Sequence, residues 1–597
     1  MLPRNLFTFF LLQGILWCLT ALGFFYSNGF YTDGWGLLFT LVFIPGQMFL
    51  FAWAFALLCF PFKWIGPRAL ASACVISGSL FSFFLAADIV VFAQYRFHIG
   101  ISLLELFFGP AGREIFIFSA GMWLLIVGLI LLIIALEIGL VFLSKKIHLS
   151  GRVFLLIAGI WIICFSLYNG VYAWGKFKMI PSVMAQSSVL PLAYPLSANR
   201  RLEKWGFTHS QTPYQLPHKG SLTYPLQPLT CAAKTPLKNI LIILVDSWRG
   251  DMLNPQVMPK LSSWLKHPGM HVFTNHLSGG NSTMGGVFSL FYAIPSSYWD
   301  DFTSEQLSPV IVTHAQELGY EPGIFASSNL SSPEFYRNVF ATIPNLRLGS
   351  AGNSSWARDI NAVEDFEKFL QTRDTQKPFF GFIFLDAPHA YDYPANAARF
   401  TPAKPMNYLL LTHKTDPTPY LNRYKNAVYF NDGLIDQVLT SLKQQGLLKN
   451  TLIILTGDHG QELNDSHQNY WGHNSNFTDY QTKVPFVIYD PSRPQTTSYT
   501  HRTSHHDVAP TILQDIYGCT NPPADYALGR SLFDETPRPF TVFAGHTEKV
   551  IRIGDDITVF NKFGGLNRYD AHLSPVQTSP DPDTLKEGLK AFGRFYK

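Results

Sequence analysis

Five long apolar runs occupy the first third of this 597-residue chain, and they constrain its fold more than any other feature. A run of about 20 apolar residues is long enough for an α-helix to cross the hydrocarbon core of a bilayer. In lipid the backbone must satisfy its own hydrogen bonds, which a helix does. We therefore expect residues 1–174 to form a transmembrane domain with five helices, at roughly 6–26, 36–60, 69–92, 115–142 and 153–174.

Basic residues in the short loops between these runs predict the orientation of the domain. Six basic residues lie on one side, and only two lie on the other. By the positive-inside rule the amino terminus is cytoplasmic. With five spans, the chain after residue 174 is expected outside the cytoplasm. The first run lacks a cleavage site, so we expect it to be retained in the mature protein. The six residues are Arg4, Lys63, Arg68, Lys145, Lys146 and Arg152, and the two are Arg96 and Arg113.

Charge and cysteine usage narrow the partners and the compartment. The formal net charge of +4 is small for this length and no long basic block occurs, so nucleic acid is not expected as a partner. Of the six cysteines, only Cys231 and Cys519 lie outside the predicted spans. They fall on the oxidising side, where a disulfide between them is one possibility.

Residues 175–236 are rich in Pro, Ser, Gln and aromatic residues and have no sustained helical or strand period. This composition predicts a juxtamembrane connector. Its basic residues fit two interpretations. They could be ordinary juxtamembrane charges that face anionic lipid, or they could recognise a lipid head group that carries phosphates. The sequence leaves both open. These residues are Lys176, Lys178, Arg200, Arg201 and Lys204.

Short β-rich runs alternate with helical stretches from residue 237 to the end of the chain at 597. The alternation predicts an extracytoplasmic α/β domain with a central, mostly parallel sheet. Functional groups of such domains gather at the carboxyl ends of the strands. The predicted strands are 240–245, 322–326, 378–385, 452–455, 484–489 and 540–543, and the predicted helices are 308–318, 360–371 and 424–445.

Two of these predicted strands end in groups that bind metals. Asp246 follows the first strand, and Asp458 and His459 follow the run 452–455. Two carboxylates and one imidazole suit a divalent Zn, Mn or Mg ion. Such an ion lowers the pKa of a bound hydroxyl and screens the negative charge of a phosphoryl or sulfuryl group under attack. We therefore expect one metal site, formed by these three residues.

A glycine-rich segment at 278–286 supplies two candidate nucleophiles, Ser282 and Thr283. The segment precedes an apolar helix candidate at 287–294, so a hydroxyl there meets free N–H groups and the positive end of the helix dipole. The alternative interpretation is a plain helix N-cap.

Two histidines flank other predicted strands. His389 follows the strand 378–385, and His473 precedes the strand 484–489. Alone, each fits a solvated loop histidine. Together with the candidate metal ligands they could bind the oxygens of a substrate, protonate a leaving group or hold a second metal.

The order of these segments resembles the alkaline phosphatase and sulfatase superfamily over about residues 239–534. The motifs are Val-Asp-Ser-x-Arg-x-Asp, Gly-Asn-Ser-Thr, Gly-Asp-His-Gly, Gly-His-Asn-Ser and Asp-Val-Ala-Pro-Thr. Within the superfamily, the hydroxyl position is similar to that of lipoteichoic-acid synthase and the phosphoethanolamine transferases, whose nucleophile is a threonine. The resemblance implies a sulfatase-type α/β fold and a divalent metal ion.

The resemblance also implies roles for single residues. Asp246, Asp458 and His459 look like metal ligands, and Ser282 occupies the nucleophile position. His389, His473 and Arg337 look like substrate contacts, the first two also like ligands of a second metal. Sulfatase activity itself is disfavoured, because formylglycine-dependent sulfatases need Cys or Ser followed by x-Pro-x-Arg, whereas Thr-Met-Gly-Gly follows Ser282.

Three further segments resemble a five-span family of inner-membrane proteins of Gram-negative bacteria. They are Leu190–Ser197, Arg201–Lys204 and Phe288–Tyr292. The resemblance implies an inner-membrane protein with a periplasmic carboxyl-terminal domain. It also implies that phospholipid or lipopolysaccharide is a partner, with another inner-membrane protein as a further one.

We therefore expect a membrane-anchored, metal-dependent phosphatase or phosphotransferase that acts on a phospholipid or lipid A head group at the periplasmic face. The alternative is a non-catalytic sensor that binds lipopolysaccharide or cardiolipin and regulates outer-membrane lipid homeostasis. Lipid transport by the spans is a third hypothesis, but the sequence shows neither an inverted repeat nor a pair of broken helices.

Overall fold

The computed structural model divides the chain into two compact units, each described here by itself. Unit 1 comprises Met1–Tyr214 and Gly565–Asn567, and unit 2 comprises Gln215–Gly564 and Arg568–Lys597. The predicted connector 175–236 lies partly outside the described residues, at 179, 188, 208–220 and 233–235. The structure describes residues 3–28, 33–95, 98–100, 104, 107–108, 118–147, 149–178, 180–187, 189–207, 221–232, 236–545, 548–560, 566–576 and 581–596.

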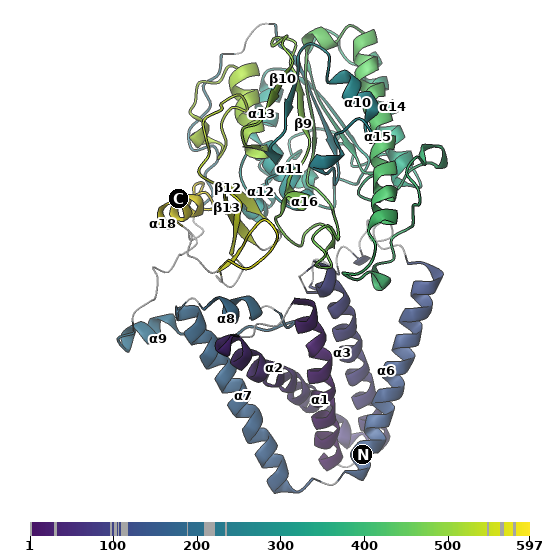
Figure 1. The fold of residues 1–597 in the computed structure, drawn as a ribbon, viewed down its shortest axis with the longest axis vertical. Coiled ribbons are helices and arrows are strands. Elements are labelled where there is room, and N and C mark those ends of the chain that lie inside the picture. Colours follow the sequence, from purple (N-terminus) through teal and green to yellow (C-terminus); the bar gives the residue numbers. More distant parts are fainter. Residues whose placement is uncertain are drawn as a thin grey trace. The chain divides into compact units, whose positions relative to one another are not determined.

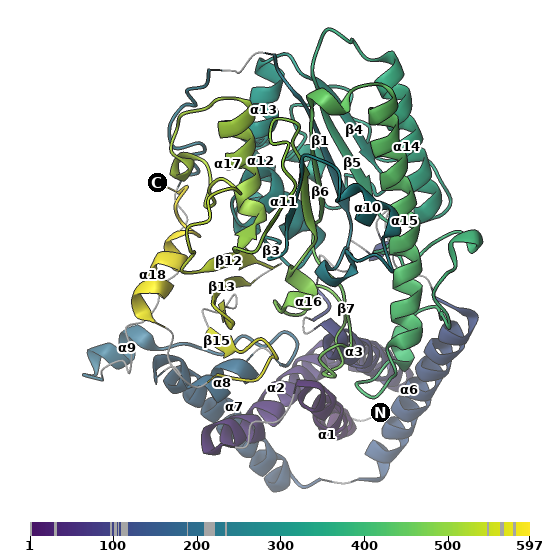
Figure 2. The same ribbon diagram turned by 45° about the horizontal axis from the view of Figure 1, so that its top comes forward.

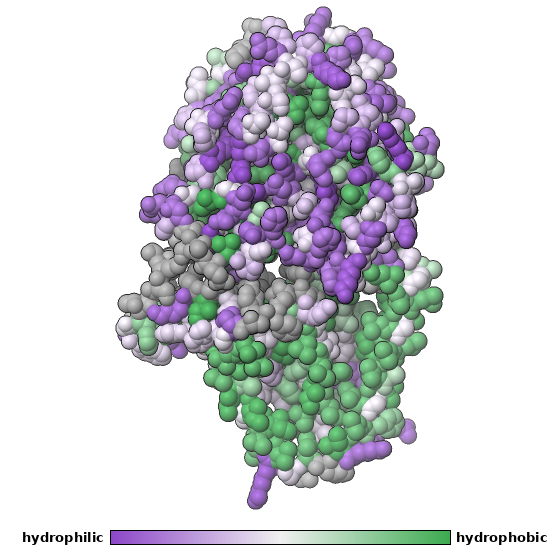
Figure 3. Space-filling model, viewed as in Figure 1, coloured by the Kyte–Doolittle hydropathy of each residue, from purple (hydrophilic) through white to green (hydrophobic). Residues whose placement is uncertain are grey.

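Five helices of unit 1 are long and apolar enough to cross a membrane, which confirms the predicted five-span domain. Each has at least 26 residues and is therefore roughly 39 Å or more in length. Figure 3 shows the apolar surface that these helices present, as expected for segments surrounded by lipid. They are α1 (Pro3–Asn28), α2 (Gly34–Cys59), α3 (Pro67–Tyr95), α6 (Ala120–Lys146) and α7 (Gly151–Lys178).

The ends of the helices differ from the ends of the apolar runs because polar residues cap them. Asp33 accepts hydrogen bonds from the backbone N–H groups of Trp35 and Gly36, and so begins α2 before its apolar run. Ser119 begins α6 in the same way, through the N–H of Met122. The last turn of α6 extends into Lys145 and Lys146, whose charges suit the negative end of a helix dipole.

The chain after α7 continues to pack on the helices of unit 1. Two short helices follow, α8 (Pro181–Gln186) and α9 (Asn199–Lys204). The side-chain amide of Gln186 donates to the carbonyl of Gly36 at 3.2 Å. Val183 and Leu190 are buried in the same apolar core as the spans. This part of the predicted connector is therefore folded.

A seven-stranded sheet forms the centre of unit 2 and confirms the predicted, mostly parallel sheet (Figures 1 and 2). Its spatial order is β10-β2-β9-β6-β1-β5-β4. β6, β1, β5 and β4 are parallel neighbours, whereas β9 runs antiparallel to β6 and β2. The bounds are β1 (Asn239–Val245), β2 (Met270–Phe273), β4 (Glu321–Ala326), β5 (Phe379–Leu385), β6 (Thr451–Gly457), β9 (Phe486–Tyr489) and β10 (Thr497–Tyr499).

Helices cover both faces of this sheet, so alternate side chains of its central strands enter two different cores. Ile240, Ile242 and Leu244 of β1 pack with α11 (Thr283–Tyr292), α13 (Val310–Glu317) and α17 (Val508–Thr511). Leu241 and Ile243 pack with α10 (Pro259–Trp264), α14 (Ser355–Thr372) and α15 (Thr418–Gln444). β1 is therefore buried along its whole length.

A smaller sheet follows near the end of the chain. It has the order β12-β13-β14-β15, and α18 (Pro582–Lys590) lies near it in sequence. The predicted strand 540–543 belongs to this sheet, and not to the central one. The strands are β12 (Thr541–Ala544), β13 (Lys549–Ile553), β14 (Asp556–Phe560) and β15 (Leu566–Tyr569).

Cys231 and Cys519 form a disulfide that closes a loop with a sequence separation of 288 residues. The other four cysteines are free and lie in unit 1.

Since disulfides persist in oxidising compartments, we predict that alkylation of acid-quenched cells labels four thiols and protects two. Mass spectrometry of the intact protein measures the number of labels. In the Cys231→Ser control Cys519 becomes reactive, and six labels on the wild-type protein would contradict an extracytoplasmic unit 2.

Candidate active site

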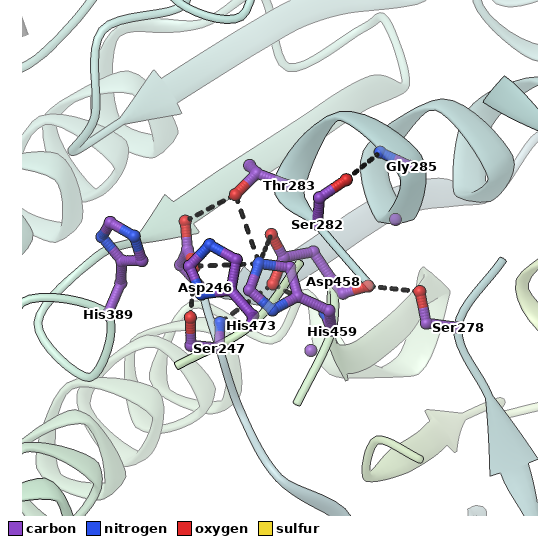
Figure 4. A network of polar contacts seen from close by, with 12 residues as sticks. Asp246, Ser247, Ser278, Ser282, Thr283, Gly285, His389, Asp458, His459 and His473 are labelled. Carbon is purple, nitrogen blue, oxygen red and sulfur yellow. Dashed lines mark hydrogen bonds and ion pairs between the residues drawn. The ribbon is translucent and has the colours of Figure 1, made fainter. Parts of the chain in front are cut away.

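The register of the central sheet brings the candidate metal ligands together. β1 and β6 are parallel neighbours, and Val245 pairs with Gly457 at their carboxyl ends. Asp246 and Asp458 are the next residues of the two strands, so they leave the sheet side by side. A ligand atom from each of them and one from His459 lie within 4.8 Å of one another (Figure 4).

The hydrogen bonds of Asp458 and His459 leave one ligand atom of each residue free to bind a metal. Asp458 Oδ1 accepts from the backbone N–H groups of Ser247 and His459, at 2.9 and 2.8 Å. Asp458 Oδ2 is buried and accepts no hydrogen bond from the described residues. His459 Nδ1 donates to the carbonyl of Gly460 at 2.8 Å, so its Nε2 carries a lone pair. That Nε2 lies 3.6 Å from Asp246 Oδ1 and 3.5 Å from Asp458 Oδ2.

The electrostatics of the group fit a bound cation. Burial raises the pKa of Asp246 to about 7, and the neighbouring Asp458 carboxylate adds to the effect. Burial also raises the pKa of Asp458 to about 7 and lowers the pKa of His459 to about 4. Two buried carboxylates and a neutral imidazole are costly without a compensating charge. Oxygen and nitrogen ligands of this kind suit a divalent ion, so the three residues fit the predicted metal.

The structure separates the two candidate nucleophiles. Ser282 Oγ accepts a hydrogen bond from the Gly285 N–H at 3.2 Å and thereby caps α11. Thr283 Oγ1 lies 3.4 Å from Asp246 Oδ2 and 3.3 Å from His459 Nε2 (Figure 4). Of the two hydroxyls, that of Thr283 faces the candidate metal ligands, whereas the superfamily resemblance assigned the nucleophile position to Ser282.

Gly286 allows α11 to approach the metal ligands. A Cβ atom at this position would collide with the backbone carbonyl of Asp458. A larger residue would push α11, and Thr283 with it, away from β6. The sequence offers a signal for this contact in the paired glycines at 285 and 286, which are unusual within a helix.

His389 lies at the end of β5, beside Asp246. A ring nitrogen of His389 and one carboxylate oxygen each from Asp246 and Asp386 lie within 4.8 Å of one another. His389 Nδ1 is 3.4 Å from Asp386 Oδ1, and Arg358 donates to Asp386 Oδ2 at 3.1 Å. Although burial disfavours a charged ring, Asp246 and Asp386 raise the pKa of His389 to about 10. His389 is therefore held as a cation in the absence of a metal.

A buried carboxylate on α14 fixes the loop that carries His389. Asp359 accepts hydrogen bonds from the N–H groups of Asp386 and Ala387, at 2.8 and 3.0 Å, and from the Asn431 side chain at 2.8 Å. The sequence prediction did not include Asp386, Asp359 or Arg358 among the site residues. Asp386 could have been found by the strand-end rule that identified Asp246, whereas Asp359 carries no local signal.

His473 completes the group of histidines. Its ring centroid lies 4.3 Å from that of His459 and 5.4 Å from that of His389. His473 Nδ1 lies 2.8 Å from Gln461 Oε1, and the Gln461 amide also donates to the Tyr391 hydroxyl. Burial lowers the pKa of His473 well below its usual value, so the ring is neutral.

Arg337 lies apart from this hydrogen-bonded group. It belongs to the short helix η4 (Phe335–Arg337), and its guanidinium pairs with Glu334 at 3.3 Å. Among the described residues, this is its only ion pair. A role in head-group binding stays a prediction.

Comparison with known proteins defines the class. Residues 238–516 match the sulfatase family, and residues 4–231 match a domain of unknown function, DUF3413. Residues 238–516, which carry the strand-end site described above, therefore form a sulfatase-type domain, and members of the sulfatase superfamily use divalent metal ions.

Two relatives from other bacteria match most of the chain. The chain is similar to inner membrane protein YejM of Salmonella typhimurium, with 25% identity over 94% of this chain and 91% of that protein. An uncharacterized protein of Haemophilus influenzae is 26% identical over 90% of this chain and 86% of that protein. The chain is therefore similar to YejM over nearly its whole length, and its five apolar helices support a location in the inner membrane.

A solved structure shares the two-part architecture. The integral membrane lipooligosaccharide phosphoethanolamine transferase A (EptA) of Neisseria meningitidis superposes with a TM-score of 0.57 and 17% identity. The superposition covers 87% of this chain and 98% of EptA. It shows that membrane helices followed by a sulfatase-type domain form a known fold.

The raised pKa of Asp458 predicts a pH-dependent difference between the wild-type protein and the Asp458→Asn variant when both are metal-free. An acid whose folded pKa is about 7 stabilises the fold below its unfolded value of about 4 and loses this contribution as pH rises to 7. The melting temperature of the wild-type protein should therefore fall, relative to that of the variant, between pH 4 and 7. Calorimetry at several pH values measures this difference.

The same pair of proteins tests the metal. Added Mn or Zn should raise the melting temperature of the wild-type protein, and binding by the variant should be at least 10-fold weaker by isothermal titration calorimetry. Asp416→Asn, which changes an exposed carboxylate, is the matched control. Equal metal binding by all three proteins would place the metal elsewhere.

Proposed function

We propose that the chain is a metal-dependent phosphoric-ester hydrolase or transferase that uses Thr283 as its nucleophile. Its substrate is a phospholipid or lipid A head group, and unit 2 lies at the periplasmic face of the inner membrane. The observation that carries the proposal is the position of Thr283 Oγ1, within 3.4 Å of Asp246 and 3.3 Å of His459.

Asp246, Asp458 and His459 are the residues that would hold the metal ion. When bound, such an ion screens the negative charge of the phosphoryl group and favours the ionised form of a nearby hydroxyl. Because the ligands lie on rigid strand ends, they hold this position without a conformational change.

Thr283 then attacks the phosphorus atom. A bond forms between Thr283 Oγ1 and phosphorus, the bond from phosphorus to the head-group oxygen breaks, and the hydroxyl proton passes to water. The leaving oxygen takes a proton, which His389 is placed to donate. Attack by water on the phosphothreonine completes a hydrolysis, and attack by an acceptor hydroxyl completes a transfer.

The lipid substrate is supported by the membrane helices and by the residues that follow them. Arg201, Lys204 and Trp205 have exposed side chains, and so does Tyr194. Basic and aromatic side chains together suit a phosphate-bearing lipid surface. The solved relative EptA transfers phosphoethanolamine to a lipooligosaccharide, which accords with this substrate class.

These exposed residues also support a second candidate function, that of a non-catalytic lipopolysaccharide or cardiolipin sensor that contacts another inner-membrane protein. The sensor needs the basic residues but not the metal site. The readout is outer-membrane lipid homeostasis in cells. Its loss in an Arg201→Gln, Lys204→Gln variant, together with normal homeostasis in Thr283→Ala, would favour the sensor.

Two alanine variants test the nucleophile. Thr283→Ala should lower kcat for a phosphodiester by at least 10³-fold, because it removes the attacking oxygen. Ser282→Ala should cost about 1 kcal/mol of helix stability as a lost cap and keep most of the activity. Turnover of bis-p-nitrophenyl phosphate with Mn or Zn measures both, and mass spectrometry tests for phosphothreonine. Turnover that survives in Thr283→Ala would show that the assignment is wrong.

The proposed general acid predicts a dependence on the leaving group. His389→Gln should slow cleavage of an alkyl phosphoester by about 10²–10⁴-fold, because an alkoxide needs a proton to leave. Cleavage of a p-nitrophenyl ester should change much less, since that leaving group is stable as an anion. His413→Gln, which changes an exposed histidine, is the control. Equal losses with both esters would assign His389 a role in binding only.

A further inference from the structure

Glu137 places a carboxyl group deep within a membrane span. It lies nine residues from the end of α6 at Lys146, which is roughly 13 Å along the helix axis. Its side chain is fully buried among the helices of unit 1. Both the bilayer and the surrounding protein are apolar at this depth, so an ionised carboxylate would be costly there. The site that we have described in unit 2 does not use this group.

The donors that reach Glu137 all bind one of its two oxygens. Glu137 Oε1 accepts from the Gln13 side-chain amide of α1 at 2.8 Å and from the Ser82 hydroxyl of α3 at 3.0 Å. Trp17 of α1 in turn donates to the Ser82 hydroxyl at 2.9 Å. The cluster therefore joins three spans through side-chain hydrogen bonds.

Two buried acceptor atoms in this cluster have no donor. Neither Glu137 Oε2 nor Gln13 Oε1 has a hydrogen-bond partner in the described structure. No Lys or Arg side chain forms an ion pair with Glu137 in the part of the chain that is described. The two side chains are already joined, because Gln13 Nε2 donates to Glu137 Oε1. A proton on Glu137 Oε2 would give the carboxyl group the donor that the Gln13 carbonyl lacks, as in a carboxylic acid–amide pair.

The neighbouring helix leaves room for this carboxyl group. A Cβ atom on Gly78 of α3 would lie 2.5 Å from Glu137 Oε2. A glycine weakens the interior of a helix, so its presence there calls for a packing reason. The close approach of the acid supplies one.

The second buried carboxyl group of unit 1 has the opposite environment. Asp88 of α3 is fully buried, but both of its oxygens face donors. Oδ2 lies 2.7 Å from His98 Nδ1, and Oδ1 accepts from the Ile99 N–H at 2.6 Å. In the described structure, therefore, neither oxygen of Asp88 lacks a partner. Asp88 therefore has a hydrogen-bond donor at each oxygen, whereas Glu137 has donors at Oε1 alone among the described residues.

We propose that Glu137 is an intramembrane proton-binding site. The neutral acid donates from Oε2 to Gln13 Oε1 and accepts from Gln13 Nε2, and this pair joins α6 to α1, with Ser82 of α3 as the third member. Occupancy by the proton is thereby tied to the packing of three spans. This inference is independent of the activity proposed for unit 2.

Infrared difference spectroscopy of the full chain in lipid, at about pH 7 in D₂O, tests the proposal. The wild-type spectrum minus that of Glu137→Gln should show the carbonyl band of one protonated acid. Acids of unit 2 cancel in this difference. Carboxylate bands in place of the carbonyl band would overturn the proposal.

Two further variants test the pairing. Gln13→Leu should shift the acid band to higher frequency, because the carboxyl group loses its amide partner, and an unshifted band would show that the two side chains are not paired. Glu137→Gln should unfold at the wild-type temperature, since its amide also offers a donor and an acceptor, whereas Glu137→Leu should unfold at a lower temperature. The infrared result on Glu137→Gln stands even if Glu137→Leu fails to fold.

Discussion

The burial of two carboxylates side by side is the constraint on which the rest of unit 2 depends. β1 and β6 are parallel and in register, so Asp246 and Asp458 emerge at adjacent positions and neither reaches solvent. Like charges in a buried site repel each other and are costly to desolvate. A divalent cation held by these residues would remove both penalties at once.

The residues around this pair are arranged by the same electrostatics. His459 turns its protonated nitrogen toward the carbonyl of Gly460 and its lone pair toward the carboxylates. His389 lies between Asp246 and Asp386, and Asp386 is held by Arg358. Negative and positive side chains therefore lie close together in this group. Thr283 is the first residue of α11, and its hydroxyl faces Asp246 and His459.

Sequence patterns predicted the parts of the molecule that follow from local physics. Apolar runs located the five spans, and the strand-end rule located Asp246, Asp458 and His459 before any contact was known. The choice between Ser282 and Thr283 was beyond such reasoning, because a single residue decides which hydroxyl caps α11 and which one faces Asp246. β2 and β10 were also missed, since strands of four and three residues are too short to show a clear period in the sequence.

The remaining features depend on contacts between distant parts of the chain. Asp359 binds the loop after β5 from α14, and Gln13 meets Glu137 across 124 positions of sequence. Neither pair has a spacing that a sequence pattern could reveal. Polar residues within apolar runs, such as Glu137, are nevertheless visible in sequence as exceptions, and each one calls for a partner.

An anomalous-scattering map of crystals soaked in Mn or Zn would locate the metal ion. We expect a strong peak that is bounded by Asp246, Asp458 and His459, with Thr283 Oγ1 beside it. A peak at another position, or an empty site at a metal concentration that supports turnover, would show that these residues do not hold the metal.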